Sequence, residues 1–251
     1  MPKFFVNINQ VQDNKIKIIG QDVNHIKNVL RLQLDDNIQV CIKEKAITCN
    51  CTIQEICKEN VLCRILDRIK ETTESNIDIH VFQGLPKADK FEFIIEKCTE
   101  IGVKEITPVV MSRTVVKLNE KDANKKTDRW RKISEVAAKQ SGRDRILEVH
   151  NVLNFKNVFE NLKKYDIVLV AYENEKNNTL KNVLNKVESN NKYYNIAVII
   201  GPEGGIDPSE IEQLKSNVSN VEIVTLGKRI LRTETAPLVI SSNILYQLEE
   251  N

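Results

Sequence analysis

The 251-residue sequence contains no apolar run that approaches the about 20 residues a bilayer-spanning helix requires. Its N-terminal segment, MPKFFVNINQ, also lacks the apolar core of a secretory signal peptide. We therefore expect a cytoplasmic protein with no membrane partner. The composition, 41% hydrophobic and 29% charged, is typical of a globular chain that buries a substantial core in one large domain or in two smaller ones.

The spacing of a zinc site is also missing. Cys49 and Cys51 lie two residues apart in an alternating pattern, no histidine lies near them, and no C-x2–4-C pair occurs twice. In the cytoplasm the six cysteines stay reduced, so we interpret them as small core or strand residues rather than as disulfides. We expect no metal, and we interpret His25, His80 and His150 as structural residues.

An excess of one sign of charge is absent from the chain as a whole, whose formal net charge is +2. The distribution is less even, because residues 113–145 hold eleven basic and five acidic side chains, a local net charge of +6. A patch of this kind attracts phosphate groups. The alternative is that these side chains form the ordinary solvated face of a helix.

The first 70 residues favour a small β-barrel. Short segments with alternating apolar residues are separated by Asn, Asp and Gly, and one segment, QDVNHIKNVLRL, has helical character. The polar stretch KETTESN, residues 70–76, reads as a linker. The predicted strands are KFFVNI, KIKII, NIQVCI, ITCNCTIQEI and NVLCRILDRI.

After residue 76 the pattern changes to apolar strands that alternate with helices, which predicts a parallel sheet in an α/β fold. In KADKFEFIIEKCTEIGV the apolar residues fall at helical spacing, and Gly102 is placed to end that helix. A second helix is predicted in DRWRKISEVAAKQSGR, where Trp130 is interpreted as core or as dimer interface. The predicted strands are IDIHVFQG, EITPVV, RILEVH, DIVLVAY, NIAVIIG and VEIVTLG.

The turn GPEGG, residues 201–205, follows the buried strand NIAVII and precedes a well-specified helix start. Asp207 is a good N-cap, Pro208 suits the first helical position, and Glu210 can complete a capping box. Glycines in the turn can adopt positive φ and allow a ligand to approach the main chain. The fingerprints G-x-G-x-x-G and G-x-x-x-x-G-K-[ST] are absent, so the turn does not indicate a dinucleotide or P-loop site.

A second glycine turn follows in VEIVTLGKRILRTETAPLVISSNILYQL. Here Gly227 ends a strand, and Thr233 or Thr235 caps the next helix. Ligands of open α/β sheets bind at the carboxyl ends of the strands, so both turns are expected to face one pocket. Arg229 and Arg232 then border the pocket with two cations, unless they pair with nearby glutamates or face solvent.

These motifs resemble those of SPOUT-class methyltransferases of the RsmE type, which methylate N3 of a uridine in 16S ribosomal RNA. The resemblance covers nearly the whole chain, with the motifs in family order. The chain departs from the family pattern at Lys228, where proline is usual, and at Pro237, and we expect altered loop stiffness there. The motifs are HIKNVLRL, GLPKADKFEFIIEKCTEIGV, SRTVVK, RWRKISEVAAKQSGR, IGPEGGIDPSEIE and LGKRILRTETA.

The resemblance implies an RNA-binding PUA-like β-barrel in residues 1–70 and a SPOUT domain with a deep C-terminal trefoil knot in residues 74–251. It also implies S-adenosyl-L-methionine as cofactor, a homodimer, and 16S rRNA or the small ribosomal subunit as partner. The implied cofactor-binding residues are Ile200, Gly201, Glu203, Gly204, Gly205, Leu226, Gly227, Ile230, Leu231, Arg232 and Thr233.

Uridine N3 becomes nucleophilic only as its proton leaves, which requires a proton acceptor or stabilisation of the anionic base. Arg232 is predicted to provide the stabilisation. Glu203 and Glu234 are candidate bases, with structural caps or ion-pair partners as the alternative. The predicted RNA-binding residues are Arg31, Lys87, Lys90, Arg113 and Arg143.

Two other functions stay open at this point. One is a catalytically silent dimer that only binds RNA, and the other is a related SPOUT methyltransferase that acts on another rRNA or tRNA nucleotide. The barrel joined to the KADKFEF and KQSGR motifs favours the uridine reaction.

Overall fold

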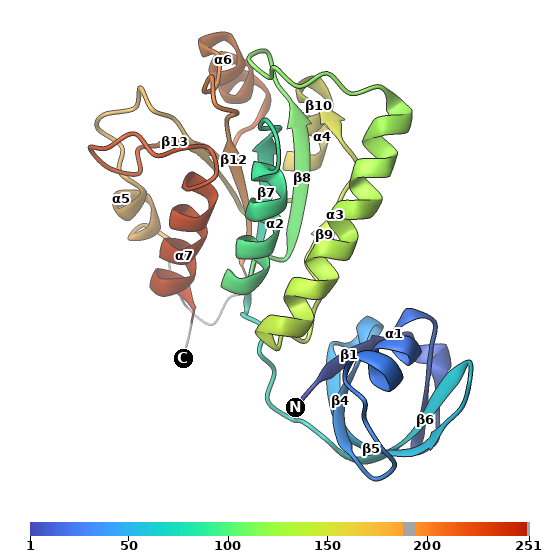
Figure 1. The fold of residues 1–251 in the computed structure, drawn as a ribbon. Helices are drawn as coiled ribbons and strands as arrows, with labels where there is room; N and C mark the ends of the chain where they lie inside the picture. Colours follow the sequence, from blue (N-terminus) through green and yellow to red (C-terminus); the bar gives the residue numbers. More distant parts are fainter. Residues whose placement is uncertain (188–193, 250–251) are drawn as a thin grey trace. The chain divides into compact units, whose positions relative to one another are not determined.

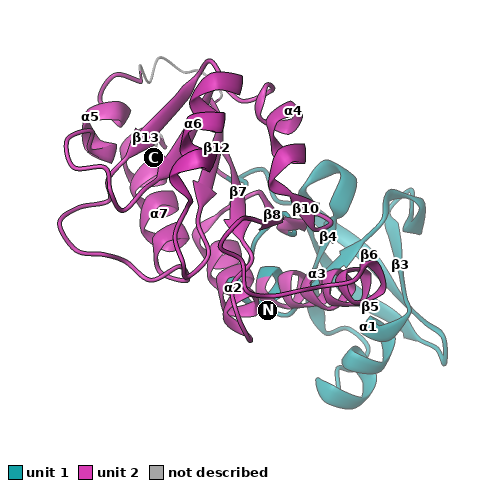
Figure 2. Ribbon diagram, turned by 90° about the horizontal axis from the view of Figure 1, so that it is seen from above, with its two compact units in different colours: residues 1–74, 138–146 teal, residues 75–137, 147–251 magenta. Residues whose placement is uncertain are grey.

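The computed structural model describes residues 1–187 and 194–249. The chain divides into two compact units, shown in different colours in Figure 2. The small unit contains residues 1–74 and 138–146, and the large unit contains residues 75–137 and 147–251. No helix within the described ranges is both long enough and apolar enough to cross a membrane.

The small unit is built on one six-stranded sheet with the order β1-β4-β5-β6-β3-β2. β1 and β4 are parallel, and the other pairs are antiparallel. In β3 the buried residues Ile16 and Ile18 alternate with exposed ones, as expected when one face of a sheet covers a core. The strands are β1 (Lys3–Val6), β2 (Val11–Gln12), β3 (Lys15–Ile19), β4 (Asn37–Ile42), β5 (Ile47–Ile56) and β6 (Asn60–Arg68).

The five strands predicted in this part of the chain all form, and the short β2 was not predicted. The predicted helical segment forms as α1 (Gln21–Asn24), which continues as a wider π-helical turn over His25–Val29. The cysteines of the described residues are all free thiols, and all except Cys57 are buried. Their interpretation as core and strand residues is therefore confirmed except at Cys57, which is partly buried and follows the end of β5.

A buried carboxylate ties the segment 138–146 to the rest of the small unit. Asp144 is 3% exposed, and it accepts hydrogen bonds from Lys3 Nζ at 2.7 Å and from the Thr73 amide at 3.0 Å. The hydroxyls of Thr48 and Thr72 donate to the same carboxylate. Thr72 and Thr73 of the predicted linker are thus held by the Asp144 carboxylate, a contact that the pattern of apolar residues could not reveal.

The large unit contains a seven-stranded sheet in which every pair is parallel, as predicted. The order is β10-β8-β7-β12-β11-β13, and β9 pairs with β8. β7 is buried along its whole length, as expected for a strand covered on both faces. The strands are β7 (Ile77–Gly84), β8 (Glu105–Val110), β9 (Glu148–Val149), β10 (Leu153–Asn154), β11 (Ile167–Ala171), β12 (Tyr194–Ile200) and β13 (Val221–Val224).

Helices cover both faces of this sheet (Figure 1). α7 packs against α2, α5 and β7, so the C-terminal helix lies over the centre of the sheet. The predicted helix ending at Gly102 is α2, and Gly102 adopts φ +114 at its C-cap. The helices are α2 (Lys90–Ile101), α3 (Glu120–Ser141), α4 (Val158–Leu162), α5 (Leu180–Leu184), α6 (Pro208–Asn217) and α7 (Ala236–Leu248).

Trp130, on α3, belongs to the core of the large unit. It is 3% exposed, and its ring centroid lies 4.4 Å from that of Phe91 on α2. Of the two predicted roles, core packing is therefore the one that the structure supports.

Candidate functional site

The turn after β12 is fixed by the helix that follows it. Asp207 caps α6 by accepting a hydrogen bond from the Ser209 amide at 3.0 Å, and Glu210 Oε2 accepts from the Asp207 amide at 3.0 Å. The predicted capping box is confirmed. The other oxygen of Glu210 accepts from the amide of Ser112 at 2.8 Å, so the helix start also holds the loop after β8.

The glycines of this turn are required by close approaches of the main chain. Gly205 has φ +72, and a Cβ on it would lie 2.1 Å from Glu173 Oε1. A Cβ on Gly201 would lie 2.8 Å from the carbonyl carbon of Gly205. At the end of β7, a Cβ on Gly84 would lie 2.4 Å from the main-chain nitrogen of Pro202. Close packing at these three positions therefore leaves no room for a side chain.

A buried hydrogen-bond network joins the first turn to the second. Thr233 Oγ1 donates to the Gly201 carbonyl at 2.7 Å and accepts from Gln83 Nε2 at 2.9 Å. Gln83 is fully buried, and its Oε1 has no hydrogen-bond partner in the part of the chain that the structure describes. Thr233 therefore connects the two turns, while Thr235 occupies the N-cap position of α7.

Gly227 lies in the second turn with φ +124, as predicted from its place after a strand. Pro237, one of the two departures from the family pattern, lies within the first turn of α7. Its missing N–H therefore removes no intrahelical hydrogen bond. The other departure, Lys228, is exposed.

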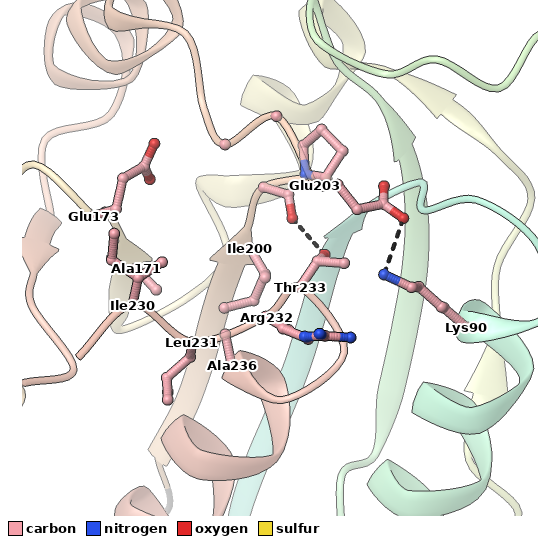
Figure 3. A pocket seen from close by; sticks show the side chains of 14 residues that line it. Lys90, Ala171, Glu173, Ile200, Glu203, Ile230, Leu231, Arg232, Thr233 and Ala236 are labelled. Atoms are coloured by element: carbon pink, nitrogen blue, oxygen red, sulfur yellow. Dashed lines mark hydrogen bonds and ion pairs between the residues drawn. The ribbon is translucent and has the colours of Figure 1, made fainter.

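Two cavities of about 420 and 410 Å³ lie between these turns and the end of β11. They share Ala171, Glu173, Ile230, Leu231 and Ala236, so they are adjacent parts of one hollow. The residues predicted to bind a cofactor all line one cavity or the other. The first cavity (Figure 3) is lined by Ile200, Gly201, Glu203, Gly204, Gly205, Ile230, Leu231, Arg232 and Thr233, and the second by Leu226, Gly227, Ile230 and Leu231.

A lysine between two carboxylates lies at the first cavity. Lys90 Nζ is 3.1 Å from Glu234 Oε2 and 3.3 Å from Glu203 Oε1. Hydrogen bonding to Glu234 and then to Glu203 raises the pKa of Lys90. Burial alone would raise the pKa of Glu203, but hydrogen bonds from the main-chain amides of Glu203 and Lys87, with help from Lys90, hold it below its usual value.

Arg232 is the cation that remains accessible beside this cluster. Its side chain is 82% exposed, and Nη1 lies 3.9 Å from Glu234 Oε1. In Figure 3 the guanidinium extends toward the side of the cavity where Lys90 lies. The alternative prediction was that Arg232 forms an ion pair with a nearby glutamate. The contact with Glu234 is long and the arginine is exposed, so this pair contributes little to stability.

The predicted RNA contacts of the large unit differ in their surroundings. Lys87 is exposed, whereas Lys90 lies in the cavity as described. Arg113 is exposed but anchored, because Nη1 donates to the Gly204 carbonyl at 3.0 Å and Nη2 lies 3.2 Å from Asp207. Arg113 thus also supports the glycine turn.

The small unit contains the other two predicted RNA contacts. Arg31 is exposed, with its backbone in the left-handed region at φ 53. Arg143 is 4% exposed and pairs with Glu74 at 2.5 Å. Its prediction as a phosphate contact is corrected, because a buried arginine paired with a carboxylate has no face to offer RNA.

Sequence reasoning missed several residues of the site. Glu173 and Ala171 lie at the end of β11, and Gln83 and Gly84 lie at the end of β7, which are the two strands flanking β12. The rule that ligands bind at the carboxyl ends of parallel strands could have pointed to them once the strand order was known.

Comparison with known proteins identifies the family. Residues 73–245 match the RNA methyltransferase domain, and residues 18–66 match the RNA methyltransferase PUA domain. The chain belongs to the RNA methyltransferase family. The resemblance predicted from the ordered motifs is thereby confirmed.

Full-length relatives agree with this membership. Ribosomal RNA small subunit methyltransferase E from Bacillus subtilis is 36% identical over 255 residues, which cover 99% of this chain and 98% of the relative. The protein of the same name from Mesomycoplasma hyopneumoniae is 31% identical, over 96% of this chain and 97% of the relative. A crystal structure of ribosomal RNA small subunit methyltransferase E from Neisseria gonorrhoeae, bound to S-adenosyl methionine, matches with a TM-score of 0.85 at 26% identity, over 99% and 98% of the two chains.

The close approach of Gly84 to Pro202 gives a first prediction. We expect Gly84→Ala to lower the melting temperature of the large unit by roughly 5 °C, because the added methyl group collides with backbone at a cost of about 1–3 kcal/mol. Fluorescence of Trp130, the single tryptophan, reports unfolding of this unit. Gly227→Ala is the comparison without a collision, since a Cβ there meets nothing within 4 Å and any loss of stability comes from the strained positive φ alone. A Gly84→Ala protein that melts like the wild type would contradict the observed packing.

Proposed function

We propose that the protein uses S-adenosyl-L-methionine to methylate N3 of a uridine in 16S rRNA of the small ribosomal subunit. The observation that carries the proposal is the pair of glycine turns joined through Thr233 around one hollow, in a chain of the RNA methyltransferase family. The names of the full-length relatives and the S-adenosyl methionine bound to one of them support the same activity.

The lining residues fit this cofactor. The cavity volumes, about 420 and 410 Å³, fall in the range of about 300–1,000 Å³ that is typical of small-molecule sites. Gly201 and Gly205 line the first cavity and Gly227 lines the second, so both turns border the space proposed for an adenosine moiety. Glu173 lines both cavities and offers a carboxylate to a cationic group. The Thr233 hydroxyl, in the lining of the first cavity, is fixed by its hydrogen bonds with the Gly201 carbonyl and Gln83 Nε2.

When bound, the cofactor supplies an electrophilic methyl group on a sulfonium. The chain must then favour the deprotonated uridine. Arg232, exposed at the rim of the first cavity, is placed to stabilise negative charge on the carbonyl oxygens of the base. The buried apolar side chains of Ile200 and Ala236 line the first cavity and help to exclude water from it.

Two carboxylates are candidates for the proton acceptor. The lowered pKa of Glu203 makes it a weak base, so its contact with Lys90 suits it to holding the ammonium in place. Glu234 lies between Lys90 and Arg232, with a side chain that is 18% exposed. Both carboxylates contact Lys90, so Glu203 and Glu234 are both candidates for the acceptor, and the other one positions the ammonium.

Basic side chains position the RNA through its phosphates. In the large unit Lys87 and Arg113 lie beside the glycine turn, where a bound strand would pass close to the first cavity. Lys90 contributes positive charge inside that cavity. In the small unit Arg31 is the candidate contact, in the part of the chain that resembles PUA domains.

In this proposal the domains, the chain topology and the oligomeric state are those of the SPOUT class. Residues 1–70 form the RNA-binding PUA-like barrel, and residues 74–251 form the methyltransferase domain with its C-terminal segment threaded as a deep trefoil knot. The active form is a homodimer that works in the cytoplasm. The position of β12 between β7 and β11, with α7 packed on β7, supports a C-terminal segment that returns to the centre of the sheet.

The experiment that tests this function is methyl transfer from labelled S-adenosyl-L-methionine to small ribosomal subunits and to naked 16S rRNA, both lacking the modification. We expect 3-methyluridine in the nucleoside digest of at least one of the two substrates. Binding of cofactor without formation of 3-methyluridine would retain the cofactor site and refute the uridine target. If the protein neither binds the cofactor nor forms 3-methyluridine, the result would favour the catalytically silent RNA-binding dimer.

The proposed role of Arg232 gives a separate prediction. Arg232→Ala should lower kcat by about 10²–10³-fold, the typical effect of losing one group that stabilises transition-state charge. The Kd for cofactor should change by less than about 3-fold, because the exposed guanidinium acts on the base. Lys215→Ala, which removes an exposed cation on α6, is the control and should keep wild-type kcat. An Arg232→Ala enzyme with unchanged kcat would exclude the electrostatic role.

A further inference from the structure

Histidine and carboxylate side chains gather on β7, on β8 and just after β9, and none of them lines either cavity. Among the described residues, His80, Glu105 and His150 bring their ligand atoms within 4.8 Å of one another. The strand register explains why they meet. His80 of β7 pairs with Glu105, the first residue of β8, and Glu105 pairs with Glu148 of β9. His150 lies two residues after Glu148 and so returns to the same face of the sheet.

The distances within the group are those of ligands that share a cation. Glu105 Oε2 lies 2.9 Å from His150 Nε2 and 3.2 Å from His80 Nδ1. Zinc binds nitrogen and carboxylate oxygen at about 2.0–2.2 Å, which separates tetrahedral ligand atoms by about 3.3–3.6 Å. Small side-chain shifts are therefore enough to place an ion among the three atoms.

The ring nitrogen that does not face the centre has an oxygen neighbour in both histidines. His80 Nε2 lies 2.7 Å from Thr107 Oγ1, and His150 Nδ1 lies 3.8 Å from Glu148 Oε1. Histidines that bind metals commonly hold their second nitrogen in this way, against a hydroxyl, a carbonyl or a carboxylate. The contact of His80 Nε2 with Thr107 Oγ1 is a second observation, independent of the three central atoms, that indicates a metal site. The separation of 3.8 Å at His150 is an ion-pair distance only.

We propose that His80 Nδ1, His150 Nε2 and Glu105 Oε2 bind one divalent transition-metal ion of the zinc type. The hydroxyl of Tyr165, which contacts His80 Nδ1, or a water fills the fourth position. The ion joins β7, β8 and the segment after β9, so its role is to stabilise the large unit rather than to take part in methyl transfer. This proposal differs from the sequence-based expectation of structural histidines and no metal.

A metal ion can reach these three side chains, and the charges around them do not prevent it from binding. The side chain of His80 is 6% exposed and that of Glu105 is 17% exposed, whereas His150 is 33% exposed and provides an entry route. Lys164 Nζ lies 3.9 Å from Glu105 Oε2, which opposes a second cation. Its side chain is 55% exposed and can turn toward water when the ion enters.

The test is metal binding to the full-length protein without a histidine tag, after treatment with a chelator and dialysis. Titration with Co²⁺, followed by its visible absorption, should show one ion per chain, with band intensities of a four- or five-coordinate site and no thiolate charge-transfer band. Zn²⁺ should displace the Co²⁺ and raise the melting temperature measured by Trp130 fluorescence.

Matched variants distinguish this site from others in the chain. His150→Ala and Glu105→Gln should each weaken binding by at least about 10-fold. His25→Ala, a histidine of the small unit, and Cys57→Ser, its partly exposed thiol, should bind like the wild type. Absence of Co²⁺ binding to the wild type would overturn the proposal and leave a group joined by hydrogen bonds alone. Binding that persists in both His150→Ala and Glu105→Gln would overturn it equally.

Discussion

The hydrogen bond from the Thr233 hydroxyl to the Gly201 carbonyl is the interaction on which the site depends. It joins the turn after β12 to the turn after β13, which lie at the ends of strands separated by β11. Gln83, at the end of β7, donates to the same hydroxyl and so extends the junction to a third strand. Breaking a buried network of this kind leaves polar groups without partners, which costs about 1–3 kcal/mol for each group. Two loops without repetitive structure are thereby held in one arrangement.

The charge at the rim of the site is set by one lysine that two carboxylates share and by one exposed arginine. Lys90 lies between Glu203 and Glu234, so a single ammonium positions both carboxylates and leaves the cluster with a net negative charge. Arg232 remains outside this cluster and exposed, which keeps its guanidinium available for a ligand. An arginine fully paired with carboxylates, as Arg143 is with Glu74, could not serve in that way.

Much of this arrangement could be predicted because it depends on local signals. The capping box at Asp207 and the glycine that ends α2 follow from neighbours in the sequence, and both were confirmed. The meeting of the two glycine turns follows from the parallel strands, whose carboxyl ends share one edge of the sheet. The family resemblance then named eleven residues, each of which lines one of the two cavities or both.

The rest depends on contacts between distant residues, which no periodicity encodes. The segment 138–146 belongs to the small unit because Asp144 meets Lys3 and Thr73, and the burial of Arg143 follows from Glu74. The group around Glu105 arises from the register of three strands, which the sequence does not reveal. Glu173 was missed because its closeness to Gly205 requires the order of the sheet.

The most direct test of the junction is the Kd for S-adenosyl-L-methionine of the Thr233→Val protein, measured by calorimetry beside the wild type. Valine keeps the shape of threonine but removes the hydroxyl, so the Gly201 carbonyl and the Gln83 amide lose their shared partner. We predict that binding weakens by about 10-fold or more, in line with the cost of leaving buried polar groups unpaired, in a protein that is still folded by near-UV circular dichroism. An unchanged Kd in that folded protein would show that the two turns hold the cofactor without the Thr233 junction.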